Sequence, residues 1–218
     1  MVPTVGRRCG FPMWSFSTIP SADIGILGGT FDPVHNGHLA AARQLLGVAN
    51  LDQVWLMPNA TPPHRTAVPV APADDRMRMV ELAVAGQNGV LASRTEVDRG
   101  GISYTIDTIR QLAREYPRQR FAFLIGSDAA LQIRSWHDAE ALLAEGYFVI
   151  FNRPETALAI ETLRELGFVP ARSRIVHLDT PAIAAHQVRD RVARGAPIDD
   201  LVPSAVADFI RTHELYQV

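Results

Sequence analysis

The chain has 218 residues, of which 47% are hydrophobic and 20% are charged, and its formal net charge is −2. This composition is typical of a folded globular protein and lacks the basic field that proteins use to bind nucleic acid, so we expect no nucleic-acid partner. Cys9 is the only cysteine, which excludes an intrachain disulfide or a cysteine metal cluster within one chain and indicates a reducing, cytoplasmic compartment.

The first 22 residues differ in character from the rest of the chain. Pro12 and Pro20 interrupt their apolar stretch, which therefore lacks the unbroken run of about 7–15 apolar residues that a signal peptide needs. We expect a disordered leader or a non-native extension, with Met13 as a candidate start, followed by a single domain over residues 23–218. No run of about 18 consecutive apolar residues occurs, so we expect no membrane partner.

From Asp23 onward, short apolar runs alternate with segments of helical periodicity. The predicted strands are Ile24 to Leu27, Gln53 to Met57, Val90 to Val97, Arg120 to Ile125, Tyr147 to Phe151 and Arg174 to Leu178. The predicted helices begin near His38, at Asp74 and near Tyr104, and further helices cover Ala139 to Glu145, Ala157 to Leu166, His186 to Arg194 and Ser204 to Thr212. This alternation predicts an α/β fold, a doubly wound parallel sheet with helices on both faces.

The segment after the first predicted strand is the most informative one, and it reads Gly28-Gly29-Thr30-Phe31-Asp32-Pro33-Val34-His35-Asn36-Gly37-His38. Glycines at the end of a strand let the backbone approach a phosphate closely, and the amides of the following helix point toward the anion. Two imidazoles beside that phosphate can donate hydrogen bonds as charge builds up during an in-line displacement. Zinc binding is a weaker alternative, because no third ligand stands at motif spacing.

This run resembles the signature of the nucleotidylyltransferases, which carry His-x-Gly-His on a Rossmann-like fold. Within that group the chain is similar to the bacterial nicotinate-nucleotide adenylyltransferases, which join nicotinate mononucleotide to ATP and release deamido-NAD and pyrophosphate. The likeness covers nearly everything from Asp23 to Tyr216. Beyond the signature it includes Pro58 to His64, Arg76, Ser103-Tyr104-Thr105, Gly126-Ser127-Asp128, Trp136 and Arg153-Pro154.

The resemblance implies two groups of site residues. Those implied for ATP are Gly28, Gly29, Thr30, Phe31, His35, His38, Gly126, Asp128, Ile183 and Arg189, with His35 and His38 as the catalytic pair. Those implied for nicotinate mononucleotide are Asn59, His64, Ser103, Tyr104, Thr105, Trp136, His137 and Arg153. A substrate phosphate is already an anion at neutral pH, so direct in-line attack on the α-phosphate needs no general base. Mg²⁺ would arrive with ATP, held by phosphate oxygens and water and by no protein ligand.

Trp136 has two interpretations. Its flat face suits stacking on a nicotinate ring, and backbone amides near Thr105 and His137 would then receive the ring carboxylate. On residue chemistry alone, a tryptophan at the start of a helix also serves as half-buried packing.

The sequence departs from the family at Ile183-Ala184-Ala185-His186, where the family usually has Ile-Ser-Ser-Thr or Ile-Ser-Ala-Thr with hydroxyls on the ATP phosphates. We expect weakened ATP contacts and retained activity, because helix amides and Arg189 remain. Two alternatives stay open: another acceptor, such as nicotinamide mononucleotide or phosphopantetheine, and a protein that binds nucleotides without turnover. The sequence also leaves the oligomeric state open, including a homo-oligomer.

Overall fold

The structure, a computed structural model, describes residues 24–63, 69–152 and 158–217. Its centre is a six-stranded sheet with the strand order β3-β2-β1-β4-β5-β6, and every neighbouring pair is parallel. The strands are β1 (Ile24–Gly29), β2 (Gln53–Pro58), β3 (Val90–Ala92), β4 (Phe121–Gly126), β5 (Phe148–Asn152) and β6 (Ser173–His177). This order is that of the dinucleotide-binding doubly wound sheets, and it confirms the predicted α/β fold class.

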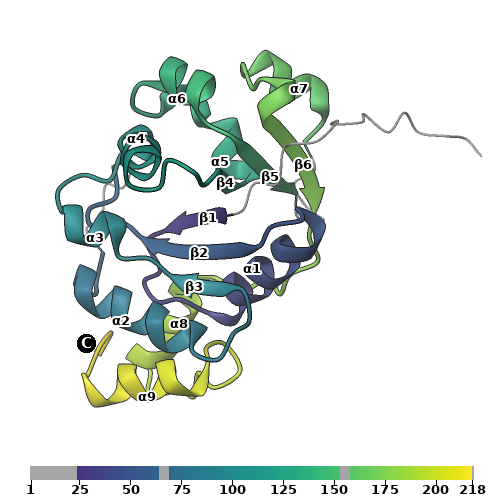
Figure 1. Cartoon of the computed structure of the whole chain (residues 1–218). Helices are drawn as coiled ribbons and strands as arrows, with labels where there is room; N and C mark the ends of the chain where they lie inside the picture. The colour runs from purple at the N-terminus through teal and green to yellow at the C-terminus, as the bar shows by residue number, and fades with distance from the viewer. Residues whose placement is uncertain (1–23, 64–68, 153–157, 218) are drawn as a thin grey trace, which may run out of the picture.

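Helices connect the strands and cover both faces of the sheet (Figure 1). They are α1 (Asn36–Val48), α2 (Ala73–Val84), α3 (Thr95–Arg99), α4 (Thr105–Glu115), α5 (Ser127–Leu131), α6 (Ala139–Glu145), α7 (Ile160–Glu165), α8 (Ala185–Ala193) and α9 (Ser204–Thr212), with short 3-10 turns at Ile133–Ser135 and Pro170–Arg172. The predicted helices are confirmed to within a few residues at their ends where the structure describes them.

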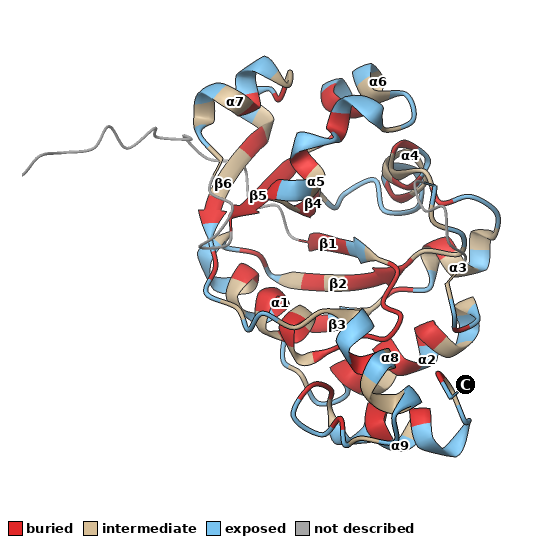
Figure 2. Cartoon of the chain, turned by 180° about the vertical axis from the view of Figure 1, so that it is seen from behind, coloured by how far each residue is buried: buried red, intermediate tan, exposed pale blue. Residues whose placement is uncertain are grey.

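The core consists of two hydrophobic layers, one on each face of the sheet. Along β1 the side chains alternate, because successive residues of a strand point to opposite faces. Ile26 packs in the layer beneath α4 and α6, whereas Leu27 packs in the layer shared by α1, α2, α8 and α9. The buried residues of these helices accordingly lie on the sides that face the sheet (Figure 2).

The strand order reverses direction at β1, whose neighbours in the sheet are β2 and β4. The chain leaves β1 through α1 toward β2, so the loops after β1 and β4 diverge to opposite faces. In doubly wound sheets, ligands bind in the crevice that such divergence leaves at the carboxyl ends of the strands. Gly28 and Gly29 end β1 and Gly126 ends β4, which places three of the predicted site residues at this point.

One predicted strand is wrong in extent. The prediction ran from Val90 to Val97, but β3 ends at Ala92 and α3 begins at Thr95. Arg94 contacts Asp98 at 3.0 Å, an i,i+4 ion pair that a helical turn brings together and an extended strand keeps apart. The prediction extended the strand beyond the apolar residues into a polar segment. Ion pairs between neighbouring side chains of that segment favour the helical turn of α3.

Among the described residues, no helix is both long and apolar enough to cross a membrane.

Candidate active site

The residues from Gly28 to His38, which we call the phosphate segment after their predicted role, are tightly packed where the chain leaves β1. Phe31 is 3% exposed, and its backbone has a φ of 50°, a left-handed conformation that is uncommon outside glycine. A Cβ atom at Gly29 would lie 3.2 Å from the Phe31 ring. The ring therefore packs directly beneath the glycine backbone, and a side chain at this position would compete for the same space.

His35 and His38 lie together at the start of α1. Their rings stack with centroids 3.6 Å apart, and the backbone N–H of His35 donates to Nδ1 of His38 at 3.2 Å. Because Nδ1 accepts this hydrogen bond, the neutral His38 ring carries its proton on Nε2. Nε2 of His38 is therefore an N–H donor. The side chain is half-buried at the N-terminus of α1, where the helix dipole also favours an anion.

The space around Gly37, between the two histidines, leaves little room for a side chain. A Cβ atom there would lie 3.1 Å from Nδ1 of His35 and 3.3 Å from the carbonyl oxygen of Pro181. The close approach also shows that the segment before α8 lies against the start of α1. Ile183 packs against the core nearby.

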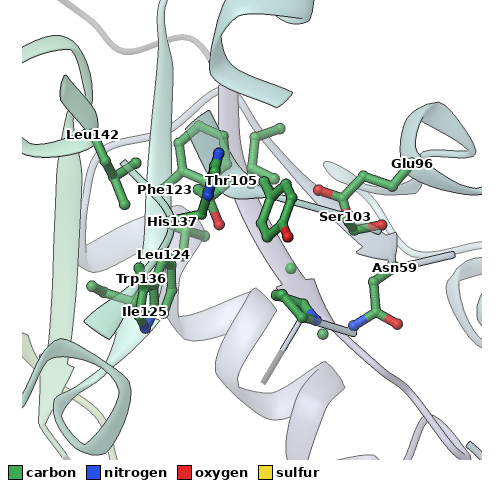
Figure 3. Close-up of a pocket in the computed structure, with 15 residues that line it drawn as sticks. Asn59, Glu96, Ser103, Thr105, Phe123, Leu124, Ile125, Trp136, His137 and Leu142 are labelled. Carbon is green, nitrogen blue, oxygen red and sulfur yellow. The ribbon is translucent and has the colours of Figure 1, made fainter. Parts of the chain in front are cut away.

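A cavity of about 180 Å³ opens beside this segment (Figure 3). All of the residues predicted for the mononucleotide that the structure describes line it: Asn59, Ser103, Tyr104, Thr105, Trp136 and His137. Gly28 and Gly29 line it too, so the cavity and the phosphate segment share a wall. His64 and Arg153, the other two residues predicted for the mononucleotide, lie outside the described residues.

Trp136 both lines the cavity and packs against the core layer beneath α4 and α6. The two interpretations offered by the sequence are therefore compatible. Tyr104 and His137 stack on each other with ring centroids 4.0 Å apart, which joins the start of α4 to the segment before α6.

Arg76, on α2, connects the loops that follow β1 and β2. Its guanidinium is 1% exposed and donates five hydrogen bonds, to the carbonyl oxygens of Thr30, Asn59, Ala60 and Ala71 and to the side-chain oxygen of Asn59. A guanidinium has five N–H donors, so these bonds use its full capacity. The side-chain oxygen of Asn59 accepts a hydrogen bond from Arg76, so the NH₂ group of Asn59 points away from Arg76. This NH₂ group contacts Oγ1 of Thr30 at 3.4 Å.

Glu96 is a cavity residue that the sequence analysis missed. It is 8% exposed and accepts a 2.6 Å hydrogen bond from Thr108, and Arg99 lies 3.9 Å away. Burial raises the pKa of Glu96, while the hydrogen bonds from Thr108 and Ser103 and the charge of Arg99 act in the opposite direction. The available signal was a carboxylate inside a predicted buried strand, since unpaired acidic residues are rarely buried.

Ser103 links Glu96 to the loop after β2. Its hydroxyl oxygen accepts the backbone N–H of Ala60 at 3.0 Å, and the same hydroxyl acts to lower the pKa of Glu96. Ser103 thus joins the Asn59–Ala60 loop to the start of α4, beside the buried carboxylate of Glu96.

Asp32 is a second buried carboxylate that the sequence left without a role. It accepts backbone N–H groups from Val70 and Ala71 at 2.8 and 3.1 Å and the phenol of Tyr216 at 2.8 Å. Arg189 donates to the Asp32 carbonyl oxygen at 2.6 Å, which places this predicted phosphate ligand beside the phosphate segment. Burial and the charge of Asp32 raise the pKa of Tyr216 well above its usual value, so the phenol remains a donor.

Asp128 and the start of α8 lie outside the cavity lining. Asp128 is exposed after β4, and its carboxylate folds back toward Gly126, where a Cβ atom would lie 2.5 Å from Oδ1 of Asp128. At α8, the Ala184 N–H donates to the Gln187 side chain at 2.9 Å, so this amide is already used within the chain. Among the residues that the structure describes, no three acidic, histidine or cysteine side chains form a group that could hold a metal ion.

Comparisons with known proteins show the family of this chain. The cytidylyltransferase-like family model matches residues 26–192. The chain is 42% identical over 198 residues to a probable nicotinate-nucleotide adenylyltransferase of Symbiobacterium thermophilum, covering 89% of this chain and 95% of that protein. It is 40% identical over 194 residues to a probable nicotinate-nucleotide adenylyltransferase of a Synechococcus species, covering 88% of this chain and 94% of that protein.

The fold is also similar to solved structures. The nicotinic acid mononucleotide adenylyltransferase of Plasmodium falciparum, complexed with NaAD, superimposes with a TM-score of 0.72 over 88% of this chain and 96% of that chain. Its sequence identity is 18%, so this likeness concerns the fold alone.

Proposed function

We propose that this chain, which belongs to the nicotinate-nucleotide adenylyltransferases within the cytidylyltransferase-like family, transfers the adenylyl group of ATP to nicotinate mononucleotide. Membership of that family makes the chain a nucleotidyltransferase of NAD biosynthesis. The products of the proposed reaction are deamido-NAD and pyrophosphate.

One observation carries the choice of substrates. Gly28 and Gly29 belong both to the phosphate segment and to the wall of the cavity that holds Trp136 and Ser103. A triphosphate at the start of α1 and a mononucleotide in the cavity would therefore meet at these glycines. This proximity supports a direct reaction between the two substrates.

The proposed step is an in-line displacement at the α-phosphorus of ATP. An oxygen of the mononucleotide phosphate forms a bond to this phosphorus, and the bond to the oxygen that bridges the α- and β-phosphates breaks, so that pyrophosphate leaves. Nε2 of His38 donates a hydrogen bond to a phosphate oxygen as charge shifts toward the leaving group. Positioning and electrostatics account for the rate enhancement, and no side chain is required to remove a proton.

Arg189 and Arg76 support the same step from two sides. Arg189 lies beside Asp32 and is half-buried, so its remaining N–H groups are candidates for the β- and γ-phosphates. Arg76 lies buried behind Thr30 and Asn59 and adds positive charge beneath the phosphate segment. Both residues thus favour an anionic ligand at the end of β1.

We propose that Mg²⁺ accompanies ATP. The described residues offer no carboxylate cage, and a Mg²⁺ ion that retains phosphate oxygens and waters as ligands needs none. When bound, the ion would neutralise charge on the phosphates. Residues 23–218 as a single domain and a cytoplasmic location are likewise proposals, supported by the continuous sheet and by the single cysteine.

The test is pyrophosphate release from ATP and magnesium with nicotinate mononucleotide, nicotinamide mononucleotide or phosphopantetheine as the acceptor. We expect release with nicotinate mononucleotide at the highest kcat/KM. Release with only a rival acceptor would contradict the acceptor assignment and leave the chemistry in place. Silence with all three would favour nucleotide binding without turnover, and the missing serines at Ala184 and Ala185 would then be the first positions to restore.

A further inference from the structure

The cavity beside the phosphate segment has room for one aromatic ring and carries a negative charge on its wall. Its volume is about 180 Å³, and a cavity of about 150 Å³ accommodates a benzene-sized molecule. Glu96 lines this space with a carboxylate, and the side chain accepts a 2.6 Å hydrogen bond from Thr108 and lies 3.9 Å from Arg99. A ring held here is therefore close to a positioned carboxylate.

The two sides of the cavity differ in chemistry. Figure 3 shows Glu96, Ser103 and Asn59 on one side, and Trp136 and His137 on the other. The ribose on the ring nitrogen must run toward the phosphate segment, and Asn59 contacts Thr30 of that segment at 3.4 Å. Asn59 thus links the side of the cavity that carries Glu96 to the phosphate segment, and the nitrogen end of a bound ring would face this side.

That nitrogen is a cation in a pyridine mononucleotide, because it bears the glycosidic bond in addition to its ring bonds. We propose that the carboxylate of Glu96 is the counter-charge of the pyridinium nitrogen, so that the cavity selects acceptors whose ring is positively charged. The proposal rests on the proposed function and assigns to Glu96 the discrimination between a charged ring and a neutral one. The flat face of Trp136 acts in the same direction, since aromatic faces attract cations.

The environment of Glu96 suits this role. Charges near or below a protein surface interact through an effective dielectric of about 20 instead of about 80, so a carboxylate on the cavity wall would favour a charged ring over a neutral one. Arg99 is the cation nearest to the carboxylate in the described contacts and is 3.9 Å away, a longer separation than a direct hydrogen bond. The carboxylate therefore keeps capacity for a second cation.

The experiment compares nicotinate mononucleotide with its 1,4-dihydro form, whose ring nitrogen is neutral, by calorimetric titration. The wild type should bind the oxidised form more tightly. Glu96→Gln should reduce this preference roughly tenfold, equivalent to about 1.4 kcal/mol, while Glu96→Asp should keep most of it. Glu115→Gln, an exposed substitution on α4, is the matched control and should leave the preference unchanged.

Two results would overturn the proposal. If Glu96→Gln weakens both ligands by the same factor, the residue acts only by holding Ser103 and Thr108 in place. If the wild type binds both forms equally, the proposal fails. This comparison needs only the wild-type protein, so it decides the matter even if Glu96→Gln does not fold. The outcome is independent of turnover, because pyrophosphate release by the wild type tests the proposed function separately from ring-charge preference in binding.

Discussion

The phenol of Tyr216 donates a 2.8 Å hydrogen bond to the carboxylate of Asp32, across 184 residues of sequence. Asp32 lies in the phosphate segment and also contacts Arg189. The last turn of the chain therefore holds a residue of the candidate ATP site, although it contributes nothing to the cavity lining.

Replacing Tyr216 with Phe should lower kcat/KM for ATP about tenfold and leave KM for nicotinate mononucleotide nearly unchanged. The free energy of unfolding should fall by about 1–3 kcal/mol, because a buried carboxylate loses a donor. Steady-state kinetics with each substrate varied in turn, well below the melting temperature, measure the split. Tyr116→Phe, which removes an exposed hydroxyl, is the control. An equal loss toward both substrates would show that Tyr216 only stabilises the fold.

Replacing His38 with Ala should reduce kcat by about 10²–10³, because the Nε2 donor serves the charge that develops in the transition state. Binding of ATP should change much less than kcat. Single-turnover kinetics separate the chemical step from binding and release. His177→Ala, an exposed substitution at the end of β6, should behave like the wild type. A kcat close to that of the wild type in His38→Ala would exclude the assigned role.

Replacing Trp136 with Ala should weaken nicotinate mononucleotide by about tenfold or more and ATP by less than twofold, since a stacked ring contributes about 1–3 kcal/mol. Trp136→Phe keeps a flat ring and should recover most of the affinity. Titration of each ligand separately tests this. If both ligands weaken together, the packing of Trp136 against the core explains the result better than stacking does.

Arg76→Lys should lower the free energy of unfolding by about 2–4 kcal/mol. Lysine has three donors where Arg76 uses five, so at least two buried oxygens lose their partners. Urea denaturation of both proteins gives the difference. Arg78→Lys, two residues along the same helix and exposed, should cost less than about 0.5 kcal/mol. A cost as small as this at Arg76 would contradict its role as the connector of the two loops.

Glu96 should make stability depend on pH. Burial raises its pKa above the usual value of 4.5, so the folded protein holds this proton more tightly than the unfolded chain does. Its contribution to stability is then fully present below pH 4.5 and is lost as the pH rises through the pKa of the folded state. Urea denaturation from acidic to neutral pH should show the wild type losing stability relative to Glu96→Gln over that window. A constant difference between the two proteins would mean that the pKa is not raised.

The sequence by itself determined the fold class of this protein and the segment in which its site begins. The run from Gly28 to His38, the apolar strands and the periodic helices are local signals, because each depends on residues within a few positions of one another. They predicted a doubly wound sheet with the site at the end of β1. The residues predicted for the mononucleotide, where the structure describes them, do line one cavity.

Only the tertiary structure decided which residues complete the site. Glu96 was assigned to a strand, yet it lines the cavity from α3 and accepts a hydrogen bond from Thr108. Arg76 was noted only as part of a resemblance, and Tyr216 only marked where that resemblance ends. Their partners are distant in the chain: Arg76 contacts Thr30, and Tyr216 contacts Asp32. Such contacts leave no local pattern, because a buried polar group is satisfied by whatever the completed fold brings near it.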